Sequence, residues 1–436
     1  MTTISFTTLG CRLNQTDSHQ LQALVERRGF LTVPVEAAPD VVVINTCTVT
    51  ARAELSDRRA IRRAARLNPR ARVVVTGCWA QTSPGQVAAL GGVDLVVGNA
   101  DKARLPELLT ELRDTGRAPR IEVSDVTAAG LEPVAPPTAS RRARVFVKVQ
   151  DGCQHRCAFC IVPLARGRSR SRGPEVVEEQ VVRLVEAGHP EVVLTGVDLG
   201  HYGADLTPRA SLAALLARLT RVAGLRWLRL SSMLPAYFTD ELLEVLGGSP
   251  VMAPHLHVPL QSGSDRVLRA MRRPYTAAGY RRVVERLAAA MPGLGLGADV
   301  LVGFPGETEA DIALTLDLVE TLPFSYLHVF PYSARPGTEA AARPGRLDAR
   351  TLAARARRVR AVGEAASRRF REALVGRTED VLVLETRDRA SGDLVGLTGN
   401  YVEVTFPGPD GLQRRMARVR VTGVGAAATW GSLEAA

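Results

Sequence analysis

The segment DGCQHRCAFC (Asp151–Cys160) places three cysteines on one short loop, in the spacing C-x3-C-x2-C. We call Cys153, Cys157 and Cys160 the loop triplet. Three thiolates in this spacing can bind three irons of a [4Fe–4S] cluster and leave the fourth iron open to another ligand. The alternative is a zinc site, with His155 as the fourth ligand that structural zinc prefers. His155 lies inside the same loop and is poorly placed to turn inward, so the spacing favours the cluster.

Strand and helix patterns alternate around this loop, from Arg144 to residue 374. The predicted strands are Val145–Val149, Val192–Thr195, Trp227–Leu230, His255–Val258, Gly297–Val302 and Tyr326–Phe330. The predicted helices are 174–187, 210–222, 239–247, 276–290, 308–321 and the arginine-rich 348–374. About six such units predict a parallel (β/α) barrel, partial or complete. Because the cysteine loop follows the first strand, we expect it at the carboxyl ends of the strands, where barrel active sites lie.

Residues 1–100 repeat this alternation on a smaller scale. Short β-prone or apolar runs predict strands at Thr3–Thr8, Val41–Ile44, Val73–Thr76 and Asp94–Val97. Helical patterns predict helices at Ser18–Arg28 and Arg52–Leu67. Strand, helix and strand in this order are typical of a doubly wound parallel sheet, which gives an α/β fold.

Two further stretches differ from the α/β pattern. Residues 115–140 lose all periodicity and include Pro133, Pro136 and Pro137, so they read as a linker. Near the carboxyl terminus, apolar and polar residues alternate between glycine and aspartate turns, at Val381–Leu384, Tyr401–Thr405 and Met416–Val424. That pattern predicts a small all-β, barrel-like module. The predicted domains are therefore 1–114, 141–371 and 372–436.

The other three cysteines, Cys11, Cys47 and Cys78, are far apart in sequence but occupy equivalent places. Each lies directly after a predicted strand of the N-terminal sheet, and we call them the strand-end triplet. Because the loops after parallel strands converge at one edge of a sheet, these thiols can meet at one point. Alternatively they are small apolar residues of a core, as free cysteines often are. Their place at strand ends, not inside strands, favours a second three-cysteine cluster.

The chain has 436 residues and a formal net charge of +11, which favours an anionic partner. Residues 141–371 carry 33 basic and 22 acidic side chains, so the excess lies in the middle of the chain. Six cysteines in a chain of this length do not indicate a disulfide framework. No apolar run reaches the ~18 residues of a membrane span, and Met1–Phe6 lacks the features of a secretory signal. We therefore expect a cytoplasmic protein with no membrane partner.

The sequence resembles the methylthiotransferases of the radical SAM (S-adenosylmethionine) superfamily over essentially its whole length. The matching segments are Leu9–Asn14, Asn45–Thr50, Thr76–Gln81, Gln150–Cys160, Ala165–Arg172, Pro259–Ser264 and Val302–Thr308. Residues 372–436 are similar to the TRAM module, a small RNA-binding β-barrel. Within the family, Asn45–Thr50 and Ala165–Arg172 look most like the branch that acts on N6-threonylcarbamoyladenosine, next to the tRNA anticodon.

This resemblance implies two [4Fe–4S] clusters, one on each cysteine triplet. The loop triplet matches the cluster whose open iron binds SAM, and one electron from an external donor then cleaves SAM to a 5′-deoxyadenosyl radical. The strand-end triplet matches the family's other cluster, which can carry or donate sulfur. The central domain is accordingly expected to be a radical SAM barrel.

The resemblance also implies SAM contacts from four residues that follow predicted barrel strands: Gly196, Gln261, Ser262 and Gly303. Gly196 matches a segment that meets the methionine amino group, and Gly303 lies in a segment expected to approach the adenine. Read without the resemblance, Gly196 marks an ordinary turn at a strand end. These assignments therefore depend on the family.

Four arginines, Arg166, Arg168, Arg170 and Arg172, alternate just after the loop triplet. On an extended segment, a period of two would place all four on one side. We expect them to contact RNA phosphates and to make binding depend on salt. The alternative is an ordinary solvated loop.

Together these features predict an enzyme that adds a methylthio group to carbon-2 of N6-threonylcarbamoyladenosine in tRNA, with no DNA partner. Two alternatives keep the chemistry and change the target to isopentenyl-adenosine in tRNA or to an aspartate of a ribosomal protein. A third is a non-catalytic RNA-binding protein that holds structural zinc. Analysis of iron and sulfide in protein purified without oxygen separates this last alternative from the others.

Overall fold

The computed structural model describes residues 1–112, 118–127, 130–131 and 142–434, and the chain divides into two compact units. The first unit consists of Met1–Thr138, Gln150–Arg172 and Ser333–Ala341. The second consists of Ala139–Val149, Gly173–Tyr332 and Ala342–Ala436. The cysteine loop therefore folds with the N-terminal sheet, although the sequence assigned it to the predicted domain 141–371. Within the described residues, no helix has the length and apolar character needed to cross a membrane.

The first unit is built on a six-stranded sheet in the order β2-β1-β3-β4-β5-β6, in which every neighbouring pair is parallel. Its strands are β1 (Thr3–Thr8), β2 (Leu31–Thr32), β3 (Val41–Thr46), β4 (Arg72–Gly77), β5 (Leu95–Val97) and β6 (Arg120–Glu122). Strand β6 lies inside the predicted linker 115–140, most of which falls outside the described residues. Because β1 lies between β2 and β3, the strand order reverses there, and such a switch point is where open α/β sheets bind ligands.

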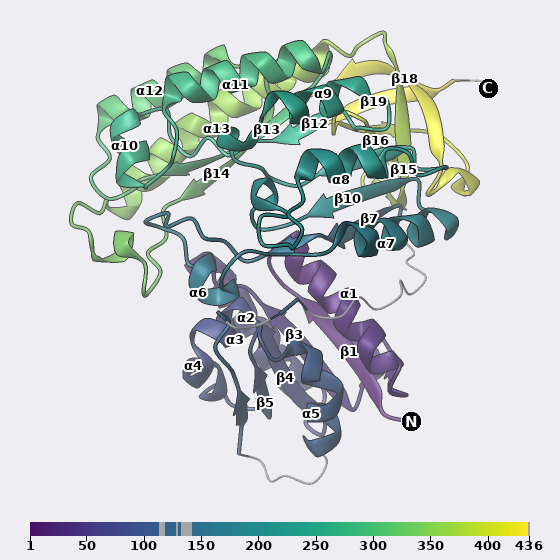
Figure 1. Ribbon diagram of the computed structural model, residues 1–436, viewed down its shortest axis with the longest axis vertical. Helices are drawn as coiled ribbons and strands as arrows, with labels where there is room; N and C mark the ends of the chain where they lie inside the picture. Colours follow the sequence, from purple (N-terminus) through teal and green to yellow (C-terminus); the bar gives the residue numbers. More distant parts are fainter. Residues whose placement is uncertain (113–117, 128–129, 132–141, 435–436) are drawn as a thin grey trace. The chain divides into compact units, whose positions relative to one another are not determined.

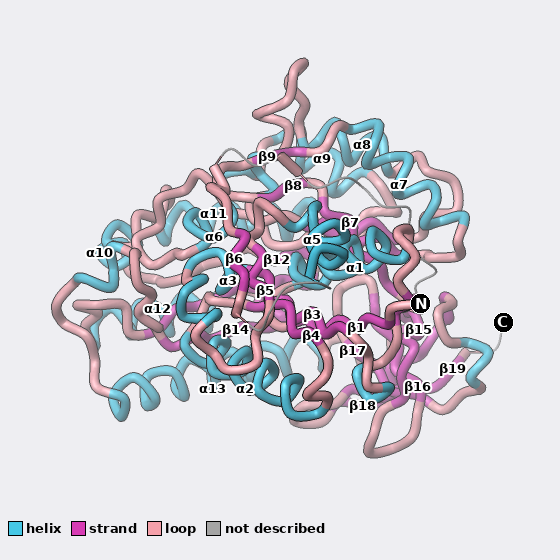
Figure 2. The backbone as a smooth tube through the Cα atoms, turned by 90° about the horizontal axis from the view of Figure 1, so that it is seen from below, coloured by secondary structure: helices cyan, strands magenta, loops and turns pink. Residues whose placement is uncertain are grey.

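Helices cover both faces of this sheet, as the prediction of a doubly wound fold requires (Figures 1 and 2). They are α1 (Arg12–Glu26) and α5 (Leu105–Glu111) on one face, and α2 (Ala51–Leu67), α3 (Cys78–Thr82) and α4 (Pro84–Ala88) on the other. Within β3, Val41 and Val43 pack on the first face, whereas Val42 and Ile44 pack on the second. The continuous apolar run of β3 is thus explained by burial on both sides.

The second unit contains two three-stranded parallel sheets, β11-β10-β7 and β12-β13-β14, joined by a bridge between Leu228 and Met252. The strands are β7 (Arg144–Lys148), β10 (Glu191–Thr195), β11 (Trp227–Leu230), β12 (His255–His257), β13 (Gly295–Val302) and β14 (Phe324–Pro331). Within the described residues β7 and β14 do not pair, so this is an open, partial barrel.

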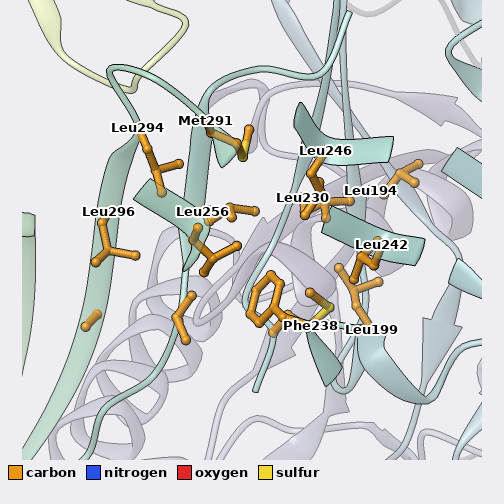
Figure 3. Close-up of a cluster of buried hydrophobic side chains, with 14 of the residues drawn as sticks. Leu194, Leu199, Leu230, Phe238, Leu242, Leu246, Leu256, Met291, Leu294 and Leu296 are labelled. Carbon is orange, nitrogen blue, oxygen red and sulfur yellow. The ribbon is translucent and has the colours of Figure 1, made fainter. Parts of the chain in front are cut away.

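Helices surround this partial barrel and close its core. They are α7 (Pro174–Glu186), α8 (Leu212–Leu219), α9 (Asp240–Gly248), α10 (Asp265–Ala270), α11 (Ala277–Ala290), α12 (Glu309–Thr321) and α13 (Ala349–Glu372). Figure 3 shows leucines of β10, β11, β12 and β13 gathered with side chains of α9 and the connecting loops. The predicted α/β barrel architecture is confirmed.

The carboxyl-terminal module is a closed five-stranded barrel in the order β15-β16-β17-β19-β18. Its strands are β15 (Thr378–Arg387), β16 (Leu394–Thr398), β17 (Glu403–Phe406), β18 (Met416–Val424) and β19 (Thr429–Leu433). The predicted all-β class is confirmed, but the sequence missed β16 and β19. Strand β16 is buried at four of its five positions and therefore lacks the alternation that marks a half-exposed strand.

The turn between β16 and β17, residues 398–401, packs against the amino ends of the barrel strands. The Tyr401 ring stacks on the His255 ring, with centroids 4.3 Å apart, and His255 is the first residue of β12. A Cβ atom on Gly295, the first residue of β13, would lie 1.9 Å from the backbone oxygen of Asn400. A glycine is therefore needed at this close approach. The turn joins the small barrel to the larger one.

A buried ion pair of the larger barrel also holds this turn in place through hydrogen bonds. Both Glu191 and Arg229 have 0% exposed side chains, and Arg229 Nε lies 2.8 Å from Glu191 Oε1. Arg229 also donates hydrogen bonds to the backbone oxygens of Gly399 and Thr398, at 2.8 and 3.4 Å. One carboxylate balances the charge of the buried guanidinium, and two backbone carbonyls accept its remaining hydrogen bonds.

Replacing Glu191 by glutamine is expected to lower the free energy of unfolding of the second unit by about 3–5 kcal/mol, because it leaves a buried guanidinium without its countercharge. Urea unfolding followed by circular dichroism measures the change. Glu179→Gln serves as the control, because Glu179 pairs with Arg183 on the exposed surface of α7, where an ion pair contributes roughly 0–1 kcal/mol. Equal effects of the two substitutions would contradict the prediction.

Candidate functional site

The strand-end triplet lies at the carboxyl ends of three adjacent strands. Cys11 precedes α1 after β1, Cys47 follows β3, and Cys78 is the first residue of α3 after β4. Strand β3 pairs with both β1 and β4, so the three loops are neighbours. Gly10, at φ +93°, is so close to Cys47 that a Cβ atom there would lie 2.6 Å from the Cys47 Cβ. The structure therefore brings these cysteines to one edge, at the switch point of the sheet.

The electrostatics of these thiols follow from their burial and closeness. Burial raises the pKa of the Cys47 thiol to about 12, and repulsion from Cys78 and Cys11 acts in the same direction. Burial also raises the pKa of the Cys78 thiol. The positive charge of Arg166 opposes this rise, whereas repulsion from Cys11 adds to it. Thiolates are the ligands of iron, so three mutually interacting thiols form a donor set that fits an iron–sulfur cluster. Within the described residues, no group of three or more His, Cys, Asp or Glu side chains is placed so that it could hold a single metal ion.

The loop triplet lies between two short strands, β8 (Gln150–Asp151) and β9 (Arg170–Ser171), that pair antiparallel. Within the loop, the Cys153 N–H donates to the backbone oxygen of Gly167 at 3.0 Å, and the Cys160 N–H donates to that of Cys157 at 3.1 Å. Gly152 has a φ of +77°, and a Cβ on it would lie 1.9 Å from the Arg168 oxygen. Backbone contacts thus determine the loop's shape, and its three thiols, all partly exposed, fit the cluster that their spacing predicts.

The prediction of one extended row of RNA-binding arginines is wrong for Arg166. This residue ends helix α6 (Val162–Arg166), and only 3% of it is exposed. Its guanidinium is paired with Asp151 at 3.0 Å and with Asp17 at 3.1 Å, so it is occupied inside the protein. Arg172 is also buried, whereas Arg168 is exposed and Arg170 is partly exposed. The period of two was misread because α6 continues to Arg166 and the chain is extended only afterwards.

Sequence reasoning missed a set of buried polar residues around the strand-end triplet. Asn14 on α1 donates hydrogen bonds to the backbone oxygens of Leu9, at 2.8 Å, and Thr46, at 2.9 Å. It thereby ties the loop after β1 to the end of β3. Asp17, one turn further along α1, pairs with Lys102 at 2.6 Å, and both side chains are buried.

These buried polar residues also explain why the sequence placed the start of α1 too late, at Ser18. The first turns of the helix bury Asn14, Thr16 and Asp17, so apolar periodicity is absent there. A signal did exist, because Asn14 belongs to the Leu9–Asn14 segment that matched the family.

The four predicted SAM contacts all lie in the second unit, after parallel strands. Gly196 follows β10, Gln261 and Ser262 come a few residues after β12, and Gly303 follows β13. Because β12 and β13 are parallel neighbours and β10 belongs to the other sheet of the same barrel, these positions lie at its carboxyl ends. The structure thus groups the four residues at the end of the barrel where ligands bind.

All four of these residues already have hydrogen-bond partners, and the partners of Ser262 and Gly303 also explain why these residue types occur there. The Ser262 hydroxyl is buried and accepts a hydrogen bond from the Ser264 N–H at 3.2 Å. The Gly303 N–H donates to Glu307 Oε2 at 2.7 Å, and a Cβ on Gly303 would lie 2.3 Å from Leu352 Cδ1 on α13. The glycine at 303 is therefore explained by packing and by its φ of +81°. A contact of either residue with SAM stays a prediction.

Two family models match the chain, one over the N-terminal sheet and one over most of the partial barrel. Residues 147–319 match the model of the radical SAM superfamily. Residues 3–98 match the model of an uncharacterized protein family, UPF0004. The two matches contain the loop triplet and the strand-end triplet, respectively.

Several curated relatives are similar over almost the whole chain. Threonylcarbamoyladenosine tRNA methylthiotransferase MtaB of Bacillus subtilis is 39% identical over 98% of this chain and 95% of its own length. The corresponding protein of Aquifex aeolicus is 38% identical over 93% of this chain and 97% of its own. The tRNA-2-methylthio-N(6)-dimethylallyladenosine synthase of Moorella thermoacetica is 37% identical, covering 98% of this chain and 97% of its own.

Among solved structures, the radical SAM methyltransferase TsrM of Kitasatospora setae matches with a TM-score of 0.58 at 19% identity. The match covers 78% of this chain and 77% of that one. At this identity the likeness shows a shared fold and no more.

Proposed function

Because the chain belongs to the tRNA methylthiotransferases of the radical SAM superfamily, we propose that it adds a methylthio group to carbon-2 of N6-threonylcarbamoyladenosine beside the tRNA anticodon. The observation that carries the proposal is the presence of two cysteine triplets in one folded unit, one at strand ends and one on a C-x3-C-x2-C loop. The Bacillus subtilis and Aquifex aeolicus relatives named for this nucleoside support the choice of target.

The loop triplet would hold the [4Fe–4S] cluster that binds SAM, and the strand-end triplet would hold a second one. When bound, the first cluster and one SAM supply the radical that removes hydrogen from carbon-2, and a second SAM methylates the sulfur that is transferred. The protein's own part is to place the thiolates and to keep the reacting groups together. Gly196, Gln261, Ser262 and Gly303, at the carboxyl ends of the barrel strands, are the proposed SAM contacts, and an external one-electron donor supplies the electron.

Recognition of tRNA is proposed to use exposed arginines and the small carboxyl-terminal barrel. Arg168, next to the loop triplet, is exposed, and Arg170 is partly exposed. Contacts from such residues to phosphates supply affinity without reading the sequence of the RNA. A tRNA substrate also supports the proposed cytoplasmic location. The predicted domain limits 1–114, 141–371 and 372–436 are kept as a proposal.

Mass spectrometry of tRNA nucleosides from cells that lack this protein tests the proposal. We expect the 2-methylthio form of N6-threonylcarbamoyladenosine to disappear and the form without sulfur to accumulate by the same amount. Complementation with the wild-type gene should restore it, and a gene with the loop triplet changed to alanine should not.

Two other results would assign a different target. Loss of the 2-methylthio form of isopentenyl-adenosine would place the chain with the sister branch, to which the Moorella thermoacetica relative belongs. Unchanged tRNA, together with loss of a methylthio group from a ribosomal protein peptide measured in parallel, would favour the protein-modifying alternative.

A further inference from the structure

One guanidinium, that of Arg166, contacts both cysteine-bearing regions of the first unit. Its Nη1 atom donates to both carboxylate oxygens of Asp151, at 3.1 and 3.0 Å. Its Nη2 atom donates to Asn14 Oδ1 at 2.7 Å and to Asp17 Oδ2 at 3.1 Å. Helix α6, which ends at Arg166, packs against α3, which begins at Cys78, and the Arg166 charge opposes the rise that burial causes in the pKa of the Cys78 thiol.

Each of these partners lies close to a cysteine in sequence. Asp151 is two residues before Cys153 of the loop triplet, and its Oδ1 accepts a hydrogen bond from the Gly152 N–H at 2.8 Å. Asn14 is three residues after Cys11 and also binds the backbone at the end of β3, just before Cys47. Through Asn14, Arg166 is linked to the loops that carry Cys11 and Cys47; through Asp151, it is linked to the loop that carries the other triplet; and its charge acts on Cys78.

The charges in this network balance, and they are buried. Two cations, Arg166 and Lys102, face two carboxylates, Asp17 and Asp151. Burial on its own would lower the pKa of Arg166, but Asp151, the two nearby thiols and Asp17 hold it above its usual value, so the residue stays charged. A buried network of this kind adds little net stability compared with apolar packing, and its best-attested use is to specify one arrangement.

We propose that Arg166 is a positioning residue that holds the loop triplet at a set distance from the strand-end triplet and places a positive charge beside Cys78. The proposal rests on the proposed function, because it assumes that each triplet holds a cluster. The planar fork of arginine directs Nη1 to Asp151 and Nη2 to Asn14 in one fixed geometry, whereas the single ammonium nitrogen of lysine provides no such fork. The charge favours the more reduced, more negative state of a cluster on the strand-end triplet, and so raises its reduction potential.

Two variants separate the geometry from the charge. Arg166→Lys keeps the charge and loses the fork, whereas Arg166→Gln loses both. Arg72→Gln is the matched control, because Arg72 is the first residue of β4, at the end opposite Cys78, and forms a partly buried ion pair with Asp94 at 2.8 Å. All variants are prepared as full-length protein without oxygen and reconstituted with iron and sulfide.

Electron paramagnetic resonance of the reduced protein gives the first readout, through the magnetic interaction between two clusters. We expect the interaction in wild-type protein and in Arg72→Gln, and a weaker or more variable one in Arg166→Lys at equal iron content. The second readout is the midpoint potential of the strand-end cluster, measured in a Cys157→Ala background. It should shift to lower values in Arg166→Gln and much less in Arg166→Lys.

The outcomes distinguish this proposal from the proposed function. If wild-type protein fails to bind a cluster on the strand-end triplet, the proposed function is wrong, and the proposed role of Arg166 is then wrong as well. If wild-type protein binds both and Arg166→Lys leaves the magnetic interaction unchanged, the positioning role alone is overturned. An unchanged potential in Arg166→Gln would overturn the charge effect. Should Arg166→Gln not fold, Arg166→Lys, which leaves no buried carboxylate without a cation, still tests the geometry.

Discussion

Cys157→Ala protein is expected to lose reductive cleavage of SAM completely while it keeps its strand-end cluster. Cys157 is the central cysteine of the loop, and a [4Fe–4S] cube held by only two thiolates has two irons without protein ligands. Bound iron should fall from about eight to about four per chain. The measurement is formation of 5′-deoxyadenosine from SAM with a chemical reductant, together with iron and sulfide analysis of the same sample.

A matched control for this substitution is available in the same loop. Ala158, the next residue, is buried and is not a proposed ligand. Ala158→Ser therefore alters the same loop and leaves all three proposed ligands in place. That variant should keep its iron and cleave SAM. Reductive cleavage by Cys157→Ala at the wild-type rate would show that the radical site is elsewhere.

Cys47→Ala protein is expected to separate the two halves of the reaction. The loop triplet is intact, so the variant should still form 5′-deoxyadenosine, but transfer of the methylthio group to tRNA should fall below detection. Cys47 is buried beside Cys78, and its backbone N–H donates to Asp57 at 3.0 Å, a contact that alanine preserves. Removing the sulfur therefore removes a proposed ligand with little change in the fold. Iron should again fall to about four per chain.

The result to compare is the ratio of methylthiolated nucleoside to 5′-deoxyadenosine, measured by mass spectrometry. It should be zero for Cys47→Ala and unchanged for Val49→Ala, an exposed residue of the same loop. Methylthiolation by Cys47→Ala at the wild-type rate would mean that the strand-end triplet is structural, as free buried cysteines often are.

Much of the fold could be predicted because its signals are local. Strand β1 was predicted with its observed limits, and β3, β4 and β10 to within two residues at each end, since short apolar runs are typical of buried parallel strands. The placement of three cysteines after three such strands predicted that they would meet, and the parallel pairing of β1, β3 and β4 brings their loops to one edge. Neither step needs knowledge of distant contacts.

Residues whose role depends on distant partners could not be predicted. Arg166 looked like an exposed phosphate-binding arginine, because its sequence neighbours are arginines, yet its partners Asn14 and Asp17 lie about 150 positions away. Strand β6 looked like linker because three residues at the edge of a sheet carry little pattern. Strand β19 was missed because its alternation is interrupted by a glycine, Gly431.

The sequence by itself determined the spacing of the two cysteine triplets, the α/β order of the elements and the presence of an N-terminal sheet, a barrel and a small β-module. Those features are encoded by spacing and periodicity, which a chain carries along its length. Tertiary structure alone decided that the loop triplet folds with the N-terminal sheet, and that a buried arginine links it to the strand-end triplet. A charged side chain reads as exposed in a sequence, and only the fold shows the countercharges that allow it to be buried.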